Sequence, residues 1–285
     1  MNKIGFERKE EMKRILFFDL DRTLWDREEQ IPGSACEAIR QARANGHEVF
    51  INTGRSRAFV YQPQLFELEL DGAVTGAGTM IETCRKGQGK LSIQWNRNEV
   101  THYRAIHGPL ADETIRMMKE HRIYFILEGR DNLYCDVESF GDDPFIRQLA
   151  GRMGDRMLPV TGNEGQWEFQ KISCELRDAI QREEALNWLS ESYELFWHHE
   201  NVLELVPHGF TKGSGLINVC RMKGIPVENS IAFGDGRNDV EMFDAAGVAV
   251  AMGDGTEIAL AHADLVTKPF DQDGICLAMR QLGVI

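Results

Sequence analysis

Long apolar runs are missing from this chain of 285 residues. No segment approaches the roughly 20 apolar residues needed to cross a bilayer. The N-terminal stretch Met1–Arg14 is rich in Lys, Arg and Glu, and the apolar run Ile15–Phe18 that follows is too short for the core of a signal peptide. We therefore expect a cytoplasmic protein with no membrane partner.

Closely spaced cysteines and net positive charge are missing too. The six cysteines lie about 40 to 55 residues apart, so no pair has the spacing of a zinc site or a redox motif, and we expect reduced thiols. The formal net charge of −13 argues against a nucleic-acid partner, because that binding depends on neutralising phosphates with Lys and Arg. A small anionic substrate is still compatible with this charge, since a bound cation reverses the local field.

Both ends of the chain alternate between apolar strand patterns and helix patterns. At the N-terminal end we expect a strand over Arg14–Asp21, a helix opened by a capping box of Ser34 and Glu37, a strand over His47–Asn52, a helix over Ser56–Leu68 that Pro63 either kinks or begins, and a closing segment Ala73–Ile81. At the C-terminal end we expect helices over Lys212–Lys223, Asp239–Ala246, Glu257–His262 and Gly274–Gln281, with strands over Ser230–Phe233, Val248–Met252 and Leu265–Thr267. Right-handed crossovers would join these ends into one α/β unit, a Rossmann-like doubly wound parallel sheet.

The middle of the chain has a different pattern. We expect strands over Leu91–Trp95, Ile123–Glu128, Leu133–Val137, Trp167–Leu176 and Val202–Val206, with helices over Asp112–His121 and Arg182–Tyr193. Strand pairs with intervening helices are typical of an α+β domain. The predicted division is a core in two parts, residues 1–82 and 201–285, with an α+β domain of residues 83–200 inserted between them.

Polar residues follow three strands of the predicted sheet. Asp19 and Asp21 close the first strand, Thr53 follows the second, and Asp235 follows Ser230–Phe233. In such a sheet ligands bind outside the carboxyl ends of the strands, so these residues should share one crevice. Crowded carboxylates need a proton or a cation between them, and oxygen ligands without His or Cys favour Mg²⁺. The ion would take Asp19, Asp235 and the main-chain carbonyl of Asp21.

These residue types suit phosphoryl transfer. Asp19 is ionised at neutral pH, so it can attack phosphorus without a base. The hydroxyl of Thr53 and the ammonium of Lys212 can meet the charge on the transferring oxygens. Asp21 can protonate the leaving alkoxide and then deprotonate the attacking water, which requires a raised pKa that we expect the crowding to provide.

At these residues the chain resembles the haloacid dehalogenase superfamily. The quoted motifs are Asp19-Leu20-Asp21-Arg22-Thr23, Thr53-Gly54-Arg55, Thr211-Lys212-Gly213 and Gly234-Asp235-Gly236-Arg237-Asn238-Asp239, and together they are similar to the Cof-like group of sugar-phosphate phosphatases with an inserted α/β cap. The resemblance implies Asp19 as nucleophile and Asp21 as acid/base. It also implies phosphate binding by Thr53, Gly54 and Lys212, a metal held by Asp19, Asp21 and Asp235, and support from Asn238 and Asp239.

The resemblance predicts a Mg²⁺-dependent phosphatase of a small phosphorylated metabolite, such as a sugar phosphate. Two departures from the group concern Arg22, where Gly is common, and Ala77, where many relatives have Asn. The alternatives are a phosphomutase, a phosphoglycan-sugar phosphatase of the mannosyl-phosphoglycerate or sucrose-phosphate type, and a non-catalytic binding module. A further hypothesis places the hairpin tip Glu128–Asn132, with Arg130, at the leaving-group pocket.

Overall fold

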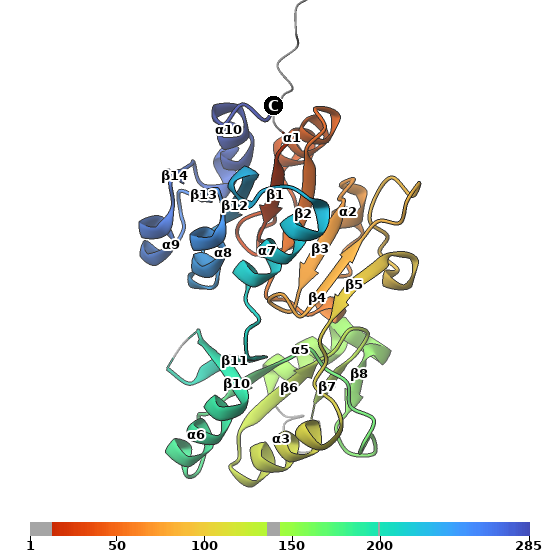
Figure 1. The fold of residues 1–285 in the computed structure, drawn as a ribbon. Helices are drawn as coiled ribbons and strands as arrows, with labels where there is room; N and C mark the ends of the chain where they lie inside the picture. Colours follow the sequence, from red (N-terminus) through yellow and green to blue (C-terminus); the bar gives the residue numbers. More distant parts are fainter. Residues whose placement is uncertain (1–12, 136–142, 199) are drawn as a thin grey trace, which may run out of the picture.

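The computed structural model describes residues 13–135, 143–198 and 200–285, which form two units, each built on one sheet (Figure 1). The core unit contains an eight-stranded sheet in the order β14-β13-β12-β1-β2-β3-β4-β5. Its strands are β1 (Ile15–Phe18), β2 (Glu48–Asn52), β3 (Gly72–Thr75), β4 (Met80–Thr83), β5 (Glu99–Tyr103), β12 (Ser230–Gly234), β13 (Val248–Ala251) and β14 (Leu265–Val266). The pairs from β14 to β3 are parallel, whereas β4 and β5 are antiparallel additions. The sequence prediction of a doubly wound parallel core is confirmed.

Helices cover both faces of the core sheet. One face carries α1 (Gly33–Ala44), α2 (Pro63–Glu67) and α10 (Gly274–Gln281), and the other carries α7 (Lys212–Lys223), α8 (Val240–Ala245) and α9 (Glu257–His262). Helix α1 buries Ala35, Ala38, Ile39 and Ala42 along one stripe, which is the spacing of a helix that packs on a sheet. All four residues of β1 are buried, as expected of a strand between two helical layers.

The cap unit contains a six-stranded sheet in the order β10-β11-β9-β6-β7-β8. Its elements are α3 (Gly108–Glu120), β6 (Tyr124–Glu128), β7 (Leu133–Cys135), α5 (Pro144–Met153), β8 (Met157–Pro159), β9 (Lys171–Glu175), α6 (Arg182–Ser192), β10 (Tyr193–Trp197) and β11 (Val202–Pro207). Helices α3 and α6 pack on one face of this sheet. Helix α5 packs with Ile126 and Leu133 on the other face, together with Ala58 of the core unit. That second face is therefore the one that meets the core.

Short 3₁₀ turns complete the described chain. They are η1 (Arg57–Phe59), η2 (Trp95–Arg97), η3 (Gly154–Arg156), η4 (Val227–Asn229), η5 (Arg237–Asp239) and η6 (Phe270–Gln272). All six cysteines are free thiols. None of the helices in the described ranges combines the length and the hydropathy of a membrane span.

Two expectations about the N-terminal half were wrong. Helix α1 begins at Gly33 without a side-chain cap, and Glu37 instead accepts hydrogen bonds from Arg40 and Gln41 one turn later. Of the two alternatives at Pro63, the structure confirms that Pro63 begins the helix, the short α2. Residues 91–95 form no strand, and the edge strand is β5, eight residues later.

The two sheets suggest a division of the chain that differs from the one expected. Strand β5 pairs with β4 in the core sheet, and β11 pairs with β9 in the cap sheet. We propose that the cap unit begins between Tyr103 and Gly108 and ends between Pro207 and Lys212, because each sheet is then left whole.

Candidate active site

The carboxyl ends of three neighbouring core strands meet at one edge of the sheet. Asp19 follows β1, Thr53 follows β2 and Asp235 follows β12, and these strands are adjacent in the sheet. Main-chain hydrogen bonds extend the strands into the site, since the amide of Asp19 donates to the carbonyl of Phe233 at 2.9 Å. All three side chains are buried. The topology thus gathers residues that are more than 200 positions apart in the chain.

Lys212 reaches this edge from the first turn of α7. Its Nζ donates to Oδ1 of Asp19 and to Oδ1 of Asp239, each at 2.6 Å. A capping box between Thr211 and Ser214 fixes the start of the helix. A methyl group on Gly213 would lie 2.2 Å from the carbonyl oxygen of Glu241, so only glycine lets α7 approach this closely. Close packing of α7 is what brings the lysine to Asp19.

Asp239 organises the loop that carries Asp235. Its Oδ2 accepts hydrogen bonds from the amides of Asp235 and Gly236, both at 2.9 Å. The hydroxyl of Thr23 donates to Oδ1 of Asp235 at 3.3 Å. Asn238, expected as a supporting residue, lies beside this loop and lines the cavity described below.

The carboxylates of Asp19, Asp235 and Asp239 form a buried cluster. Each offers an oxygen within 4.8 Å of the others. Burial raises the pKa of Asp19 well above its usual value against the opposing effect of Lys212. Burial and the charge of Asp239 raise the pKa of Asp235 to about 6. An all-oxygen, negatively charged and dry donor set fits a hard divalent cation. Since Asp239 is already bonded to Lys212 and to two amides, Asp19 and Asp235 are the better candidates for ligands.

Asp21 lies at the rim of the site. Its side chain is half exposed, and Arg55 donates two hydrogen bonds to its carboxylate, from Nε to Oδ2 at 2.8 Å and from Nη2 to Oδ1 at 2.6 Å. The indole of Trp25 donates to Oδ1 at 3.2 Å. We expect a cluster of carboxylates that includes Asp21, and the structure corrects its membership, because the residues that come together are Asp19, Asp235 and Asp239.

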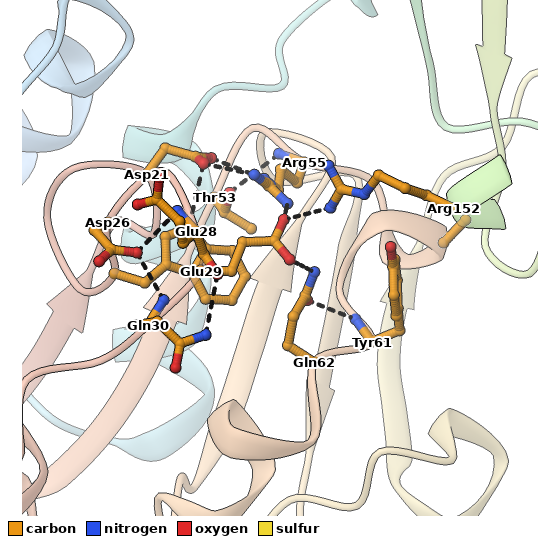
Figure 2. Close-up of polar contacts among 12 residues, drawn as sticks. Asp21, Asp26, Glu28, Glu29, Gln30, Thr53, Arg55, Tyr61, Gln62 and Arg152 are labelled. Atoms are coloured by element: carbon orange, nitrogen blue, oxygen red, sulfur yellow. Dashed lines mark hydrogen bonds and ion pairs between the residues drawn. The ribbon is translucent and has the colours of Figure 1, made fainter. Parts of the chain in front are cut away.

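A polar network continues from Asp21 to the cap unit (Figure 2). Oε1 of Glu29 accepts from Arg55 of the core and from Arg152 of α5, each at 2.8 Å. Gln62 donates to the other oxygen of Glu29. Although burial favours its neutral form, these partners lower the pKa of Glu29. One carboxylate thus joins the arginine that holds Asp21 to a helix of the cap.

The two departures from the Cof-like pattern both fall on left-handed backbone. Arg22 has φ 61° and Ala77 has φ 53°, which side chains with a Cβ adopt at a cost. Gly and Asn accept this conformation more readily than Arg and Ala do. In this chain Arg22 gains contacts of its own, to Asp235 at 3.7 Å and to Asp254 at 3.8 Å.

A cavity of about 760 Å³ opens between the core and cap units above the cluster. The core contributes Asp19, Asp21, Thr53, Gly54 and Asp235 among others, and the cap contributes residues of β10, together with His198 and Glu204. None of residues 128–132 lines it, and the hypothesis that the hairpin tip shapes this pocket was wrong. The guanidinium of Arg130 instead lies over the rings of Trp95 and Tyr103, at 3.8 Å and 5.0 Å from their centroids, in cation–π contacts.

Sequence reasoning missed the residues that connect the two units. Arg55 was quoted in a motif but given no role, and Glu29, Arg152, Lys171 and Glu204 were not singled out. Only the Thr-Gly-Arg motif carried a signal for any of them. The other four are ordinary charged residues, and each has a partner more than 30 positions away in the chain.

Comparisons with known proteins agree with this geometry. The family model of haloacid dehalogenase-like hydrolases matches residues 16–279. YkrA of Bacillus subtilis (strain 168) is 29% identical over 282 residues, which cover 95% of this chain and 98% of YkrA. The pyridoxal phosphate phosphatase YbhA of Escherichia coli (strain K12) is 25% identical, with 92% of this chain and 96% of YbhA covered.

A solved structure shares the fold over nearly the whole chain. The structure of the sugar phosphatase BT4131, of HAD subclass IIB, matches with a TM-score of 0.75 and 27% identity, covering 96% of this chain and all of that one. The two named substrates, pyridoxal phosphate and sugar phosphates, differ between these relatives. The family match, the shared architecture and the strand-end aspartates together place this chain among the haloacid dehalogenase-like hydrolases, in the phosphatase group of that superfamily.

Proposed function

We propose that this phosphatase is Mg²⁺-dependent and hydrolyses a small organic phosphate monoester, such as a sugar phosphate, through a phosphoryl group carried on Asp19. The observation that carries the proposal is the contact of Lys212 Nζ with Asp19 at 2.6 Å inside a cluster of buried carboxylates. A buried ammonium beside a buried carboxylate is suited to hold a phosphate dianion next to a nucleophile.

The first half-reaction breaks the ester bond. A carboxylate oxygen of Asp19 attacks phosphorus while the bond from phosphorus to the alkoxide oxygen breaks. Asp21 gives a proton to the leaving oxygen. Thr53 and Lys212 contact the transferring oxygens, and the amide of Gly54 directly follows Thr53 in the chain. The second half-reaction returns the site to its start, since Asp21 takes a proton from water, water attacks phosphorus, and inorganic phosphate leaves Asp19.

The role of a cation follows from the charges in the site. When bound, Mg²⁺ supplies positive charge that keeps Asp19 and Asp235 ionised and offsets their repulsion from the phosphate. Asp19, Asp235 and the main-chain carbonyl of Asp21 would hold it, with Asn238 and Asp239 in support. Asp239 contributes by fixing Lys212 and the Asp235 loop.

Arg55 has a positioning role in this scheme. It holds both oxygens of Asp21 at the rim. A fixed carboxylate at the cavity mouth can meet a leaving oxygen that points away from Asp19. The ion pair between Asp21 and Arg55 weakens when Asp21 carries a proton. During that step Glu29 remains as a second anionic partner of Arg55.

The test is phosphate release from p-nitrophenyl phosphate and from a panel of phosphorylated metabolites, with Mg²⁺ or with EDTA. The wild type should release phosphate only with Mg²⁺, and Asp19→Asn should lose at least about a thousandfold in kcat/KM while keeping its thermal transition. The matched control is Asp244→Asn, because Asp244 is exposed and pairs only with His262 among the ion pairs of the described residues. This variant should keep full activity. Near-normal turnover by Asp19→Asn would overturn the proposal.

The same panel separates the alternatives. A phosphomutase would convert a sugar phosphate to an isomeric phosphate without release of free phosphate. A phosphoglycan-sugar phosphatase would release it from the glycosyl-phosphoglycerate or disaccharide phosphate and not from simple sugar phosphates. A binding module would retain a ligand and turn over none of the panel.

A further inference from the structure

The cap wall of the cavity is acidic and aromatic. Strand β10 contributes Glu194, Leu195, Phe196 and Trp197, and β11 contributes Glu204. Among the cap residues described, no Lys or Arg lines the cavity. On the cap side of this space a leaving group therefore meets carboxylates, aromatic rings and the imidazole of His198.

Glu204 is held directly against the phosphate-binding loop. Its Oε2 would lie 3.6 Å from a methyl group at Gly54. Its Oε1 lies 2.6 Å from Nζ of Lys171 and 3.4 Å from Nε2 of His198. The carboxylate of Glu204 therefore lies beside the loop that carries Thr53 and Gly54, and both line the cavity.

Lys171 fixes this arrangement from within the cap sheet. The residue is 1% exposed, and its Nζ donates to the carbonyl oxygen of Gly54 at 3.0 Å while it pairs with Glu204. Glu128 lies on its other side at 3.7 Å. A buried ammonium with three oxygen partners has little freedom, so the position of Glu204 relative to the core is set by packing and not by the substrate.

The charge of Glu204 is permanent under physiological conditions. Although burial opposes its ionisation, Lys171 and His198 lower its pKa to about 2. The cations on the core side of the cavity are partly occupied. Arg55 is paired with Asp21 and Glu29, and Arg22 is paired with Asp235 and Asp254. Arg237 also lines the core side, where its side chain is exposed and lies opposite no cation of the cap wall.

We propose that Glu204 is a specificity-determining residue that selects a leaving group bearing hydrogen-bond donors, hydroxyl or ammonium, and rejects one bearing a second phosphate or a carboxylate. The reason is that an ionised carboxylate accepts strong hydrogen bonds from such donors and has no hydrogen to donate to the oxygens of a second phosphate or a carboxylate. Trp197 and Phe196 offer apolar surface to the carbon skeleton of the same group. This inference rests on the proposed function and narrows its substrate class.

The experiment compares three probes: a hexose 6-phosphate, its 2-amino derivative and a hexose 1,6-bisphosphate. The wild type should have a higher kcat/KM for both monophosphates than for the bisphosphate. Glu204→Gln should lower the monophosphate to bisphosphate ratio by about tenfold or more. The better of the two monophosphates tells whether hydroxyl or ammonium is preferred, and either order supports the proposal.

Two further variants keep the test decisive. Glu184→Gln makes the same change on the exposed face of α6, outside the cavity, and should leave the ratio unchanged. Glu194→Gln, on the cavity wall and more exposed, should shift the ratio in the same direction by a smaller factor even if loss of the Lys171 pair unfolds Glu204→Gln. A wild type that prefers the bisphosphate, or a ratio that neither cavity variant changes, would overturn the inference. Failure of the proposed function gives a different result, because then no probe releases phosphate at all.

Discussion

The acidic cluster should make the metal-free protein less stable at neutral pH than at lower pH. Asp235 has an ordinary pKa of 3.8, and burial with the charge of Asp239 raises it to about 6 in the folded state. The folded protein thus binds this proton more tightly than the unfolded chain does. The resulting stability is fully present below pH 3.8 and is lost as the pH rises through about 6. Because the pKa rises by roughly two units, the free energy of unfolding is about 3 kcal/mol lower at pH values well above 6 than at pH values below 3.8.

Replacing Asp235 by Asn should therefore stabilise the metal-free protein. The amide removes the charge but keeps an acceptor for Thr23. Loss of the pair with the half-exposed Arg22 costs less than about 1 kcal/mol, which leaves a gain of about 2 kcal/mol at pH 7.5. For a chain of this size that gain raises Tm by about 4 to 8 °C. The gain should shrink as the pH falls toward 4.

Thermal unfolding in EDTA and in millimolar Mg²⁺ provides the assay. Mg²⁺ should raise Tm of the wild type at pH 7.5, less so at pH 5, and should have little effect on Asp235→Asn. Asp254→Asn is the matched control, because Asp254 also pairs with Arg22 but is exposed, and it should change neither Tm nor the Mg²⁺ response. If Asp235→Asn is less stable than the wild type in EDTA at pH 7.5, the buried charge of Asp235 does not destabilise the metal-free protein.

Three other changes test the surroundings of the site. Lys212→Met leaves Asp19 and Asp239 buried without their cation, so it should lower the free energy of unfolding, measured with denaturant, by about 3 to 5 kcal/mol. The control Lys90→Met, at an exposed position, should lower it by less than about 0.5 kcal/mol. Equal losses in the two variants would contradict the buried pairing. Ala77→Asn should raise the free energy of unfolding by about 0.5 to 1 kcal/mol, because Asn accepts the left-handed backbone at φ 53°, and a loss of stability would show that strain is not relieved there. Arg152→Met removes a half-exposed contact between the units, so KM should rise about two- to fivefold with kcat within about twofold, and a tenfold fall in kcat would be inconsistent with this.

The strands and motifs of the core were readable because their signals are local. The β1 pattern, an apolar run that ends in carboxylates, reflects burial on both faces of a parallel strand, and helices α7, α9 and α10 begin and end where the sequence predicted. The errors came where local signals competed. At Ser34 a capping pattern was present, but the chain entered the helix one residue earlier, after Pro32, which already has the extended backbone of an N-cap.

From the residue pattern alone it was possible to predict which strands end in Asp19, Thr53 and Asp235 and that these ends share one edge of a sheet. The charged partners of the residues around the site could be seen only in the folded molecule. Arg55 holds Asp21, Glu29 bridges to Arg152 across 123 positions, and Lys171 reaches Gly54 across 117. The periodicity of a strand is set by residues that are neighbours in the chain. The partner of a charged side chain depends instead on how the cap sheet and the core sheet are positioned relative to each other.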